Sequence, residues 1–130
     1  MIVDTSAIMA ILLDESDAEH LIDVLFENPL RKVSAGTWIE LSAVITRHQD
    51  AVISESFDML MRKLRIEIVA MSVKQAEIDH DAYRKFGRGV KHPARLNFGD
   101  CFAYALSIES GEPLLFKGDD FGHTDIVPAS

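Results

Sequence analysis

The chain has 130 residues, of which 48% are apolar and 26% are charged, and these values are typical of a globular protein with one sizeable core. We therefore expect a single domain over residues 1–130. The net charge of −8 argues against a nucleic-acid partner, because nucleic acids are also negatively charged. A local basic segment could still bind one. No apolar run approaches the ~18 residues of a membrane span, and Asp4 interrupts an N-terminal apolar stretch that has no basic residues before it. We expect a cytoplasmic protein without a signal peptide or a membrane segment.

Short apolar runs alternate with segments of helical spacing along the chain. The predicted strands are residues 1–4, 32–36, 65–71, 114–116 and 125–127, and the predicted helices are residues 5–15, 17–28, 37–49, 51–64, 72–87 and 98–111. This order predicts an α/β fold, a three-layer sandwich with a mostly parallel central sheet of about five strands and helices on both faces. Ligands of such sheets bind at the carboxyl ends of the strands.

The helix faces follow from the spacing of apolar residues. In the helix at residues 72–87 we expect the inward contacts to come from Val73, Ala76, Ile78 and Tyr83. In the last long helix the apolar spacing begins at Phe98 and predicts a buried face that includes the only cysteine, Cys101. Cys101 cannot form an internal disulfide, and we expect it to fill the core.

Acidic residues gather at the edge where these strands end. Asp4 ends the first strand, Glu40 and Asp100 lie near the starts of two helices, and Asp119 and Asp120 follow the strand at residues 114–116. Such a group cannot stay fully ionised without a counter-charge. Like-charged carboxylates raise each other's pKa values, and burial raises them further. Carboxylates without histidine or thiolate partners favour Mg²⁺, with Mn²⁺ as an alternative, and these ions act mainly on phosphoryl substrates. The pattern predicts a phosphodiesterase.

Asp100 alone admits two interpretations. An acid in the first turn of a helix complements the helix dipole, which is worth about 0.3 to 1 kcal/mol. The same turn can instead point the carboxylate into a site, with Asn97 and Gly99 shaping the approach to the helix. The rest of the acidic group favours the second interpretation.

Residues 84–95 form a basic segment that contains no acid. It holds Arg84, Lys85, Arg88, Lys91 and Arg95. A solvated loop is the ordinary explanation, but two glycines and a proline also suit a mobile arm that contacts phosphates.

Four blocks of the sequence together resemble a PIN-domain ribonuclease of the VapC toxin type. They are "MIVDTSAIMAIL", "AGTWIELSAVI", "LNFGDCFAYALS" and "PLLFKGDDFGHTDI", which span essentially the whole chain in the family's order. The resemblance implies a metal-dependent endoribonuclease that cuts RNA (tRNA, rRNA or mRNA), inhibits translation and is neutralised by a cognate VapB-type antitoxin. It also implies a homodimer.

The resemblance places the family's metal carboxylates at Asp4, Glu40 and Asp100. The fourth acid departs from the family pattern, because "FKGDDF" puts Phe116 and Gly118 where many members have threonine and aspartate. Asp119 then supplies the carboxylate from one residue later, with Asp120 as the alternative.

The residues beside these acids have two possible roles. Thr5, Ser6 and Asn97 would support the metal ligands by hydrogen bonds, and plain helix capping explains them equally well.

Two other functions compete with the nuclease. A phosphoacceptor signalling domain would need an acid pair after the first strand, and "VDTS" does not supply one. A catalytically idle binding module would explain the apolar helices at residues 17–28 and 51–64 as a partner surface. In the nuclease interpretation the same helices are candidates for the antitoxin contact and a homodimer interface, or they simply pack in the core.

Overall fold

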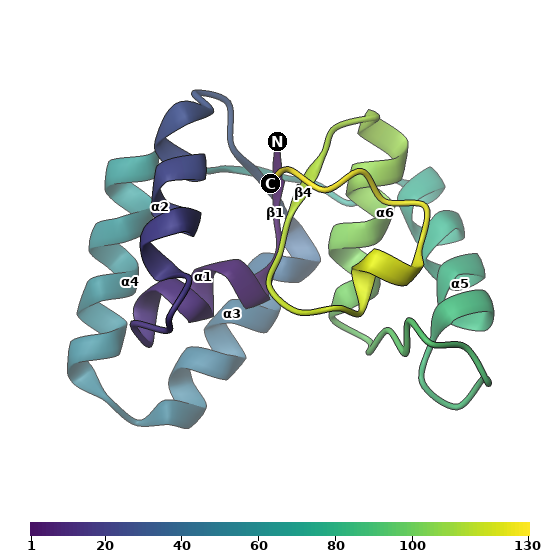
Figure 1. Ribbon diagram of the computed structural model, residues 1–130, viewed down its shortest axis with the longest axis horizontal. Coiled ribbons are helices and arrows are strands. Elements are labelled where there is room, and N and C mark those ends of the chain that lie inside the picture. The colour runs from purple at the N-terminus through teal and green to yellow at the C-terminus, as the bar shows by residue number, and fades with distance from the viewer.

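The computed structural model describes residues 1–130 and contains four strands and six helices (Figure 1). The strands are β1 (Ile2–Val3), β2 (Lys32–Ser34), β3 (Glu67–Val69) and β4 (Leu114–Leu115). The helices are α1 (Thr5–Leu12), α2 (Ala18–Glu27), α3 (Ala35–His48), α4 (Ala51–Leu64), α5 (Val73–Phe86) and α6 (Asp100–Ser110), and a short 3₁₀ helix covers Phe121–His123. None of these helices is long and apolar enough to cross a membrane.

The sheet has the order β3-β2-β1-β4, and all of its paired strands are parallel. Ile2 of β1 is in register with Lys32 of β2 on one side and with Leu114 of β4 on the other. Because the strands are parallel, their carboxyl ends meet at one edge, and the chain segments that follow them begin there.

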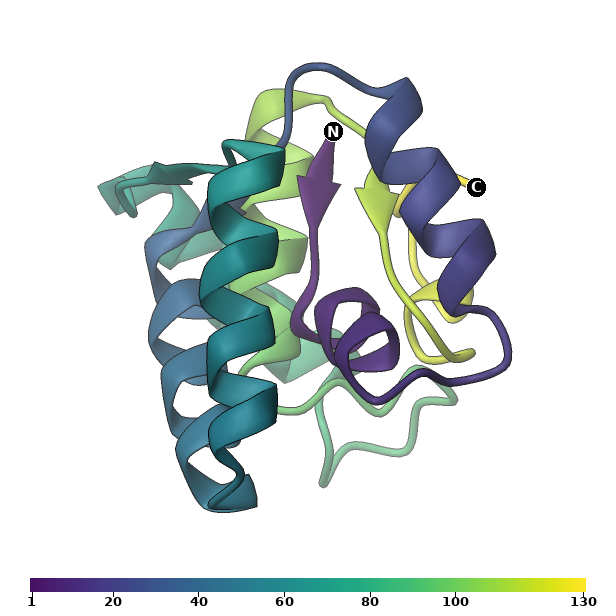
Figure 2. The same cartoon turned by 90° about the vertical axis from the view of Figure 1, so that its left-hand side faces the viewer.

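Two hydrophobic cores lie on opposite faces of the sheet, and the alternation of side chains along each strand separates them. Val3, Val33 and Leu115 face the core built with α1, α2, α3 and α4. Ile2 and Leu114 face the core built with α5 and α6. Figure 1 shows this three-layer arrangement, with α2 and α4 on the left of β1 and β4 and with α6 and α5 on the right. Figure 2 looks onto the face that α2 and α4 cover.

The sheet has four strands where about five were expected, because residues 125–127 do not form a strand. Leu114 donates its N–H to Val127 O at 2.9 Å and accepts from Ala129 N at 2.9 Å, which gives one isolated bridge between Leu114 and Pro128. The bridge is isolated, so these residues do not add a fifth strand to the sheet.

The prediction of the inward face of α5 was wrong in part. Val73 is 78% exposed and Tyr83 is 40% exposed, while Gln75, Ala82 and Phe86 are buried. Positions 75, 82 and 86 lie on one side of a helix with 3.6 residues per turn, and this side packs on α6.

Phe98 was also expected to be buried and is 72% exposed. α6 begins only at Asp100, so Phe98 lies in the preceding turn, and the helical spacing does not apply to it.

Candidate active site

Asp4 follows β1 directly and is the N-cap of α1. Its Oδ2 accepts hydrogen bonds from the Ser6 backbone N–H at 2.9 Å and from the Ser6 hydroxyl at 2.6 Å. The residue is only 1% exposed, and its Oδ1 is buried without any hydrogen-bond partner. A buried carboxylate oxygen without a partner is costly, and a bound cation would remove that cost.

Asp100 lies in the first turn of α6 and is held by Asn97 through two reciprocal hydrogen bonds. The Asn97 backbone N–H donates to Asp100 Oδ2 at 2.9 Å, and the Asp100 backbone N–H donates to Asn97 Oδ1 at 2.8 Å. This pattern is a capping box, which satisfies the free N–H groups at the helix start. It also fixes one oxygen of the Asp100 carboxylate and leaves Oδ1 without a protein partner.

Glu40 projects from the second turn of α3 toward the starts of α1 and α6. Its Oε1 accepts a hydrogen bond from the Thr5 hydroxyl at 2.5 Å. A Cβ atom added to Gly99 would lie 1.3 Å from Glu40 Oε2, so only glycine leaves room for this carboxylate. The structure therefore brings Glu40 between the helices that carry Asp4 and Asp100.

Asp4 and Asp100 both have raised pKa values, and burial is the main cause for each. The pKa of Asp4 is raised to about 7, mainly by burial and also by the charges of Asp100 and Glu40, against the lowering effect of the Ser6 hydrogen bonds. Burial also raises the pKa of Asp100 to about 6, with contributions from Glu40 and Asp120, while the Arg88 charge acts in the opposite direction. These residues thus form one electrostatic unit at the carboxyl edge of the sheet.

Asp119 and Asp120 lie in the exposed turn after β4. The charge of Asp120 contributes to the raised pKa of Asp100. Both residues stay candidates for the fourth acid, Asp119 as first expected and Asp120 as the alternative.

The acids suit a divalent ion, although no three of them are close enough to hold one in their present positions. The donors are all carboxylate oxygens, the ligands that Mg²⁺ and Mn²⁺ prefer. The unpartnered Oδ1 of Asp4 and the raised pKa values of Asp4 and Asp100 show negative charge that protein groups do not compensate. A site based on Asp4 and Asp100 therefore fits such an ion.

The PIN domain family model matches residues 1–127. Over 129 residues, the chain is 49% identical to ribonuclease VapC42 and 48% identical to ribonuclease VapC28, both of Mycobacterium tuberculosis. These alignments cover 99% of this chain and 98% and 97% of the two relatives. The chain belongs to the VapC-type PIN-domain ribonucleases.

Solved structures of VapC-type and related proteins share the fold. The sarcin–ricin loop cleaving toxin VapC20 of Mycobacterium tuberculosis superposes with a TM-score of 0.71 at 15% identity, covering 97% of this chain and 95% of that one. A toxin–antitoxin complex from Klebsiella pneumoniae gives a TM-score of 0.70 at 15% identity, covering 99% and 97%. The three-layer fold expected from the sequence is thus confirmed.

Lys117 is a residue near this VapC-type site that the sequence analysis did not identify. Its backbone N–H donates to Ser6 Oγ at 3.0 Å, and its ammonium group forms ion pairs with Glu15 and Asp17. The turn after β4 is thereby tied to α1 and to the hydroxyl that holds Asp4. A backbone contact of this kind leaves no signal in a single sequence.

Cys101, the single cysteine of this VapC-type chain, is buried in the core with α5 and α6, as expected. Burial raises the pKa of its thiol to about 12. A thiol with such a pKa is not a nucleophile near neutral pH.

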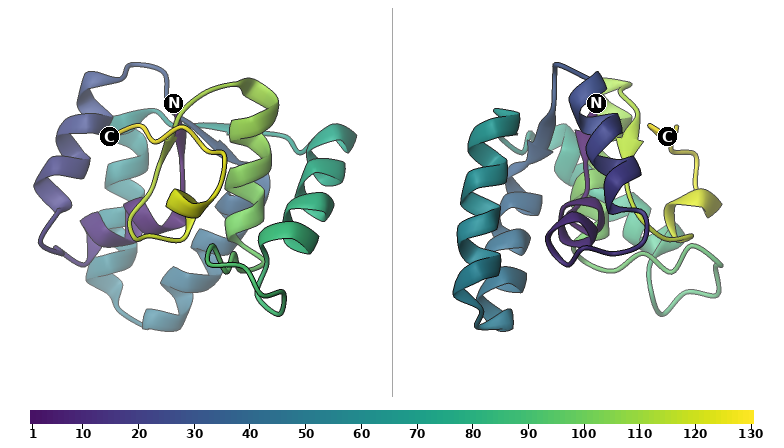
Figure 3. Two further views of the ribbon diagram at one scale, coloured as in Figure 1. Left: turned by 45° about the vertical axis from the view of Figure 1, so that its right-hand side comes forward. Right: turned by 60° about the vertical axis from the view of Figure 1, so that its left-hand side comes forward.

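The basic segment lies in the loop between α5 and α6 and at the end of α5. The side chains of Arg84, Lys85, Arg88, Lys91 and Arg95 are all exposed. In both views of Figure 3 this loop lies at the lower end of the molecule, where α6 begins. The acidic site and the basic segment of this VapC-type chain are therefore neighbours.

Proposed function

We propose that the protein is a metal-dependent endoribonuclease toxin that cuts RNA and inhibits translation. The observation that carries the proposal is Asp4, whose buried Oδ1 has no partner and whose pKa is raised beside Asp100 and Glu40. The curated relatives are named ribonucleases, and the structural neighbour VapC20 is described as cleaving the sarcin–ricin loop. We therefore propose structured RNA as the substrate to test, whether rRNA, tRNA or mRNA.

The metal would be held first by Asp4 and Asp100, with Glu40 and Asp120 (or Asp119) acting on it directly or through water. We propose Mg²⁺, with Mn²⁺ as an alternative. A divalent ion bound there lowers the pKa of a water molecule and neutralises charge that develops on the phosphate.

The residues around the acids give the site its geometry. Ser6 and Asn97 each hold one oxygen of a carboxylate, which leaves the other oxygen of Asp4 and of Asp100 free to bind a ligand. Thr5 holds Glu40 against Gly99 in the same way. These contacts fix the carboxylates before the ligand arrives, so less entropy is lost on binding.

The basic segment at residues 84–95 would contact the RNA backbone. Its five exposed cations and the absence of acids give a positive surface beside the acidic site. Phosphate contacts of this kind position the substrate without reading its sequence. They would reconcile an RNA substrate with a chain whose net charge is −8.

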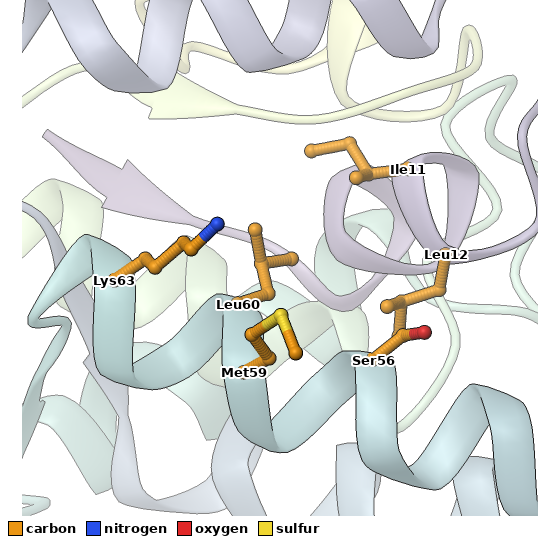
Figure 4. A pocket seen from close by; sticks show the side chains of 6 residues that line it. All are labelled: Ile11, Leu12, Ser56, Met59, Leu60 and Lys63. Carbon is orange, nitrogen blue, oxygen red and sulfur yellow. The ribbon is translucent and has the colours of Figure 1, made fainter.

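The antitoxin would bind in an apolar groove between α1 and α4. The groove has a volume of about 260 Å³, and Figure 4 shows the side chains that line it: Ile11, Leu12, Ser56, Met59, Leu60 and Lys63. A groove of this type accepts the apolar face of a helix. We expect Leu60→Lys to abolish copurification of a coexpressed antitoxin and Val52→Lys, on an exposed part of the same helix, to preserve it. Equal copurification with both variants would place the antitoxin elsewhere.

A homodimer would form through an exposed apolar patch rather than through the helices at residues 17–28 and 51–64. The patch consists of Ile39, Tyr83 and Phe98, which join α3 to α5. Clusters of this type mark protein interfaces. We expect Phe98→Asp to be monomeric in sedimentation experiments and Val127→Asp, at an isolated exposed valine, to remain a dimer. A dimeric Phe98→Asp protein would contradict this interface.

The proposed activity is tested by incubating purified protein with tRNA and ribosomal RNA in Mg²⁺, Mn²⁺ or chelator. The matched variant is Asp100→Asn, because asparagine keeps the shape and the backbone hydrogen bond of the cap but removes the charge. We expect cleavage that requires the metal and disappears in the folded variant. Cleavage that persists in chelator or in Asp100→Asn would contradict the proposal.

A further inference from the structure

The loop between α5 and α6 is closed by backbone hydrogen bonds that fix Arg88 near the acidic site. Arg88 N donates to Leu96 O at 2.8 Å, and Leu96 N donates to Phe86 O at 2.8 Å. The next residue, Asn97, holds the Asp100 carboxylate. Arg88 is therefore tied through a short chain of hydrogen bonds to the start of α6, at the end of the molecule where β1 delivers Asp4 (Figure 1).

The guanidinium group of Arg88 is oriented but not neutralised. Its Nε donates to the carbonyl oxygen of Arg95 at 3.4 Å, and Arg95 adopts the left-handed conformation with φ 49°. Neither Nη atom of Arg88 has a protein partner, and none of the chain's four ion pairs includes this residue. Its charge nevertheless lowers the pKa of Asp100. The unpartnered Nη donors of Arg88 are therefore free to bind an anion near the start of α6.

The neighbouring cations are placed differently. The Lys85 ammonium lies over the ring of Phe86, 5.0 Å from its centroid. Arg84 borders a separate surface pocket with His80 and Tyr83 on α5. Arg88 differs from both, because its backbone N–H and its Nε are bonded to Leu96 and Arg95 in the segment that leads into α6.

We propose that Arg88 binds the non-bridging oxygens of the scissile phosphate and positions it against Asp4 and Asp100. This inference rests on the proposed ribonuclease function. A guanidinium group presents two parallel N–H donors that match two phosphate oxygens, and it stays charged throughout the reaction. As water attacks phosphorus and the bond to the leaving ribose oxygen breaks, negative charge grows on those oxygens. Arg88 stabilises this charge without gaining or losing a proton.

The test compares wild type, Arg88→Ala, Arg88→Lys and Arg47→Ala on the RNA that wild type cuts fastest. Cleavage is measured in single turnovers with saturating enzyme, and RNA affinity is measured separately in chelator. We expect Arg88→Ala to lower the saturating rate by roughly 100-fold or more and the affinity by much less, because its contact strengthens in the transition state. Arg88→Lys should recover part of the rate, and Arg47→Ala, which removes an exposed charge at the end of α3, should change neither quantity.

Three different results would contradict this role of Arg88. If folded Arg88→Ala, checked by its thermal unfolding, cut at the wild-type saturating rate, the role of Arg88 would be wrong while the nuclease remained established. A rate loss in which lysine restores nothing and the unfolding temperature also drops would assign Arg88 to loop structure and overturn the inference. If wild type cut no RNA, the proposed function and the role of Arg88 would both be wrong.

Discussion

Asp4 caps α1 and also supplies the buried carboxylate of the site, and Asp100 likewise belongs to a capping box at the start of α6. Helix capping and site chemistry are therefore not alternatives for these residues. In both cases the backbone or a neighbouring side chain holds one carboxylate oxygen, and the other oxygen stays available. The helix-dipole interpretation of Asp100 describes only part of what its position does.

The raised pKa of Asp4 predicts how the stability of the metal-free protein depends on pH. Its pKa is about 7 in the folded chain against an ordinary value of 3.8, so the folded state binds the proton more tightly than the unfolded state. The free energy of unfolding should therefore fall as pH rises from about 4 to about 7 and should stay level above that. The size of the fall is on the order of 2 to 4 kcal/mol, at about 1.4 kcal/mol per pKa unit.

Asp4→Asn is the matched variant, because asparagine is also a good N-cap and has no charge to bury. In chelator we expect wild type to be less stable than Asp4→Asn above pH 7 by denaturant titration, with most of the difference gone near pH 4. Parallel pH profiles for the two proteins would contradict the burial of an uncompensated carboxylate at this position.

We expect the substitution Gly99→Ala to change the activity while leaving the fold almost unchanged. In Gly99→Ala the new methyl group meets the end of the Glu40 side chain, which can rotate away but must then leave Thr5. The backbone at Gly99 is helical, with φ −69°, so alanine itself is tolerated there. We expect the cleavage rate to fall by roughly tenfold or more, because a misplaced acid loses its alignment.

Gly122→Ala is the control, since an added Cβ meets nothing there. The thermal unfolding temperature of both variants should stay close to that of wild type. A Gly99→Ala enzyme as fast as Gly122→Ala would show that the position of Glu40 does not matter for cleavage.

The positions of Asp4, Glu40 and Asp100 could be predicted from sequence, because each follows a strand or lies in the first two turns of a helix at one sheet edge. The choice between Asp119 and Asp120 could not, because it depends on how the turn after β4 is folded. Gly118 in this turn has φ 98°, which changes the chain direction just before the two acids. Neighbouring residues in a turn point in different directions, and the sequence alone does not specify which of the two faces the site.

The helices themselves were predictable from apolar spacing, but the direction in which α5 faces was not. Its buried positions include a glutamine, and two of its apolar residues, Val73 and Tyr83, are exposed. A helix with apolar residues on more than one side gives no single inward face. Tyr83 belongs to the patch that we assign to a homodimer interface, so its exposure has a place in the proposed assembly.

The contact of α3 with α6 depends on a close approach at Gly36. A Cβ atom there would lie 2.5 Å from the Phe102 ring, so Gly36→Ala should push the two helices apart. We expect a loss of about 1 to 3 kcal/mol in the free energy of unfolding, measured by denaturant titration, as is typical of overpacking. Combining it with Phe102→Leu should recover part of the loss. Additive destabilisation in the double variant would show that the ring is not the obstacle.

The two cores and the parallel sheet explain why the acids meet at all. β1 is central and contributes Ile2 to one core and Val3 to the other, so the residue that follows, Asp4, is fixed from both faces of the sheet. The class of fold and its active edge follow from the order of strands and helices in the sequence. The number of strands does not, because residues 125–127 carry a strand-like pattern and the chain there forms only one isolated bridge to β4, at Pro128.

Metal binding is the central claim, and it is tested most directly by calorimetric titration of purified, chelator-treated protein with Mn²⁺. The measurement compares wild type with Asp4→Asn, which should fold at least as stably because it removes a buried charge. We predict a binding isotherm for wild type, with a rise in thermal unfolding temperature as the metal concentration increases, and loss of both in Asp4→Asn. The same Mn²⁺ affinity in Asp4→Asn as in wild type, or no binding to either, would contradict the account.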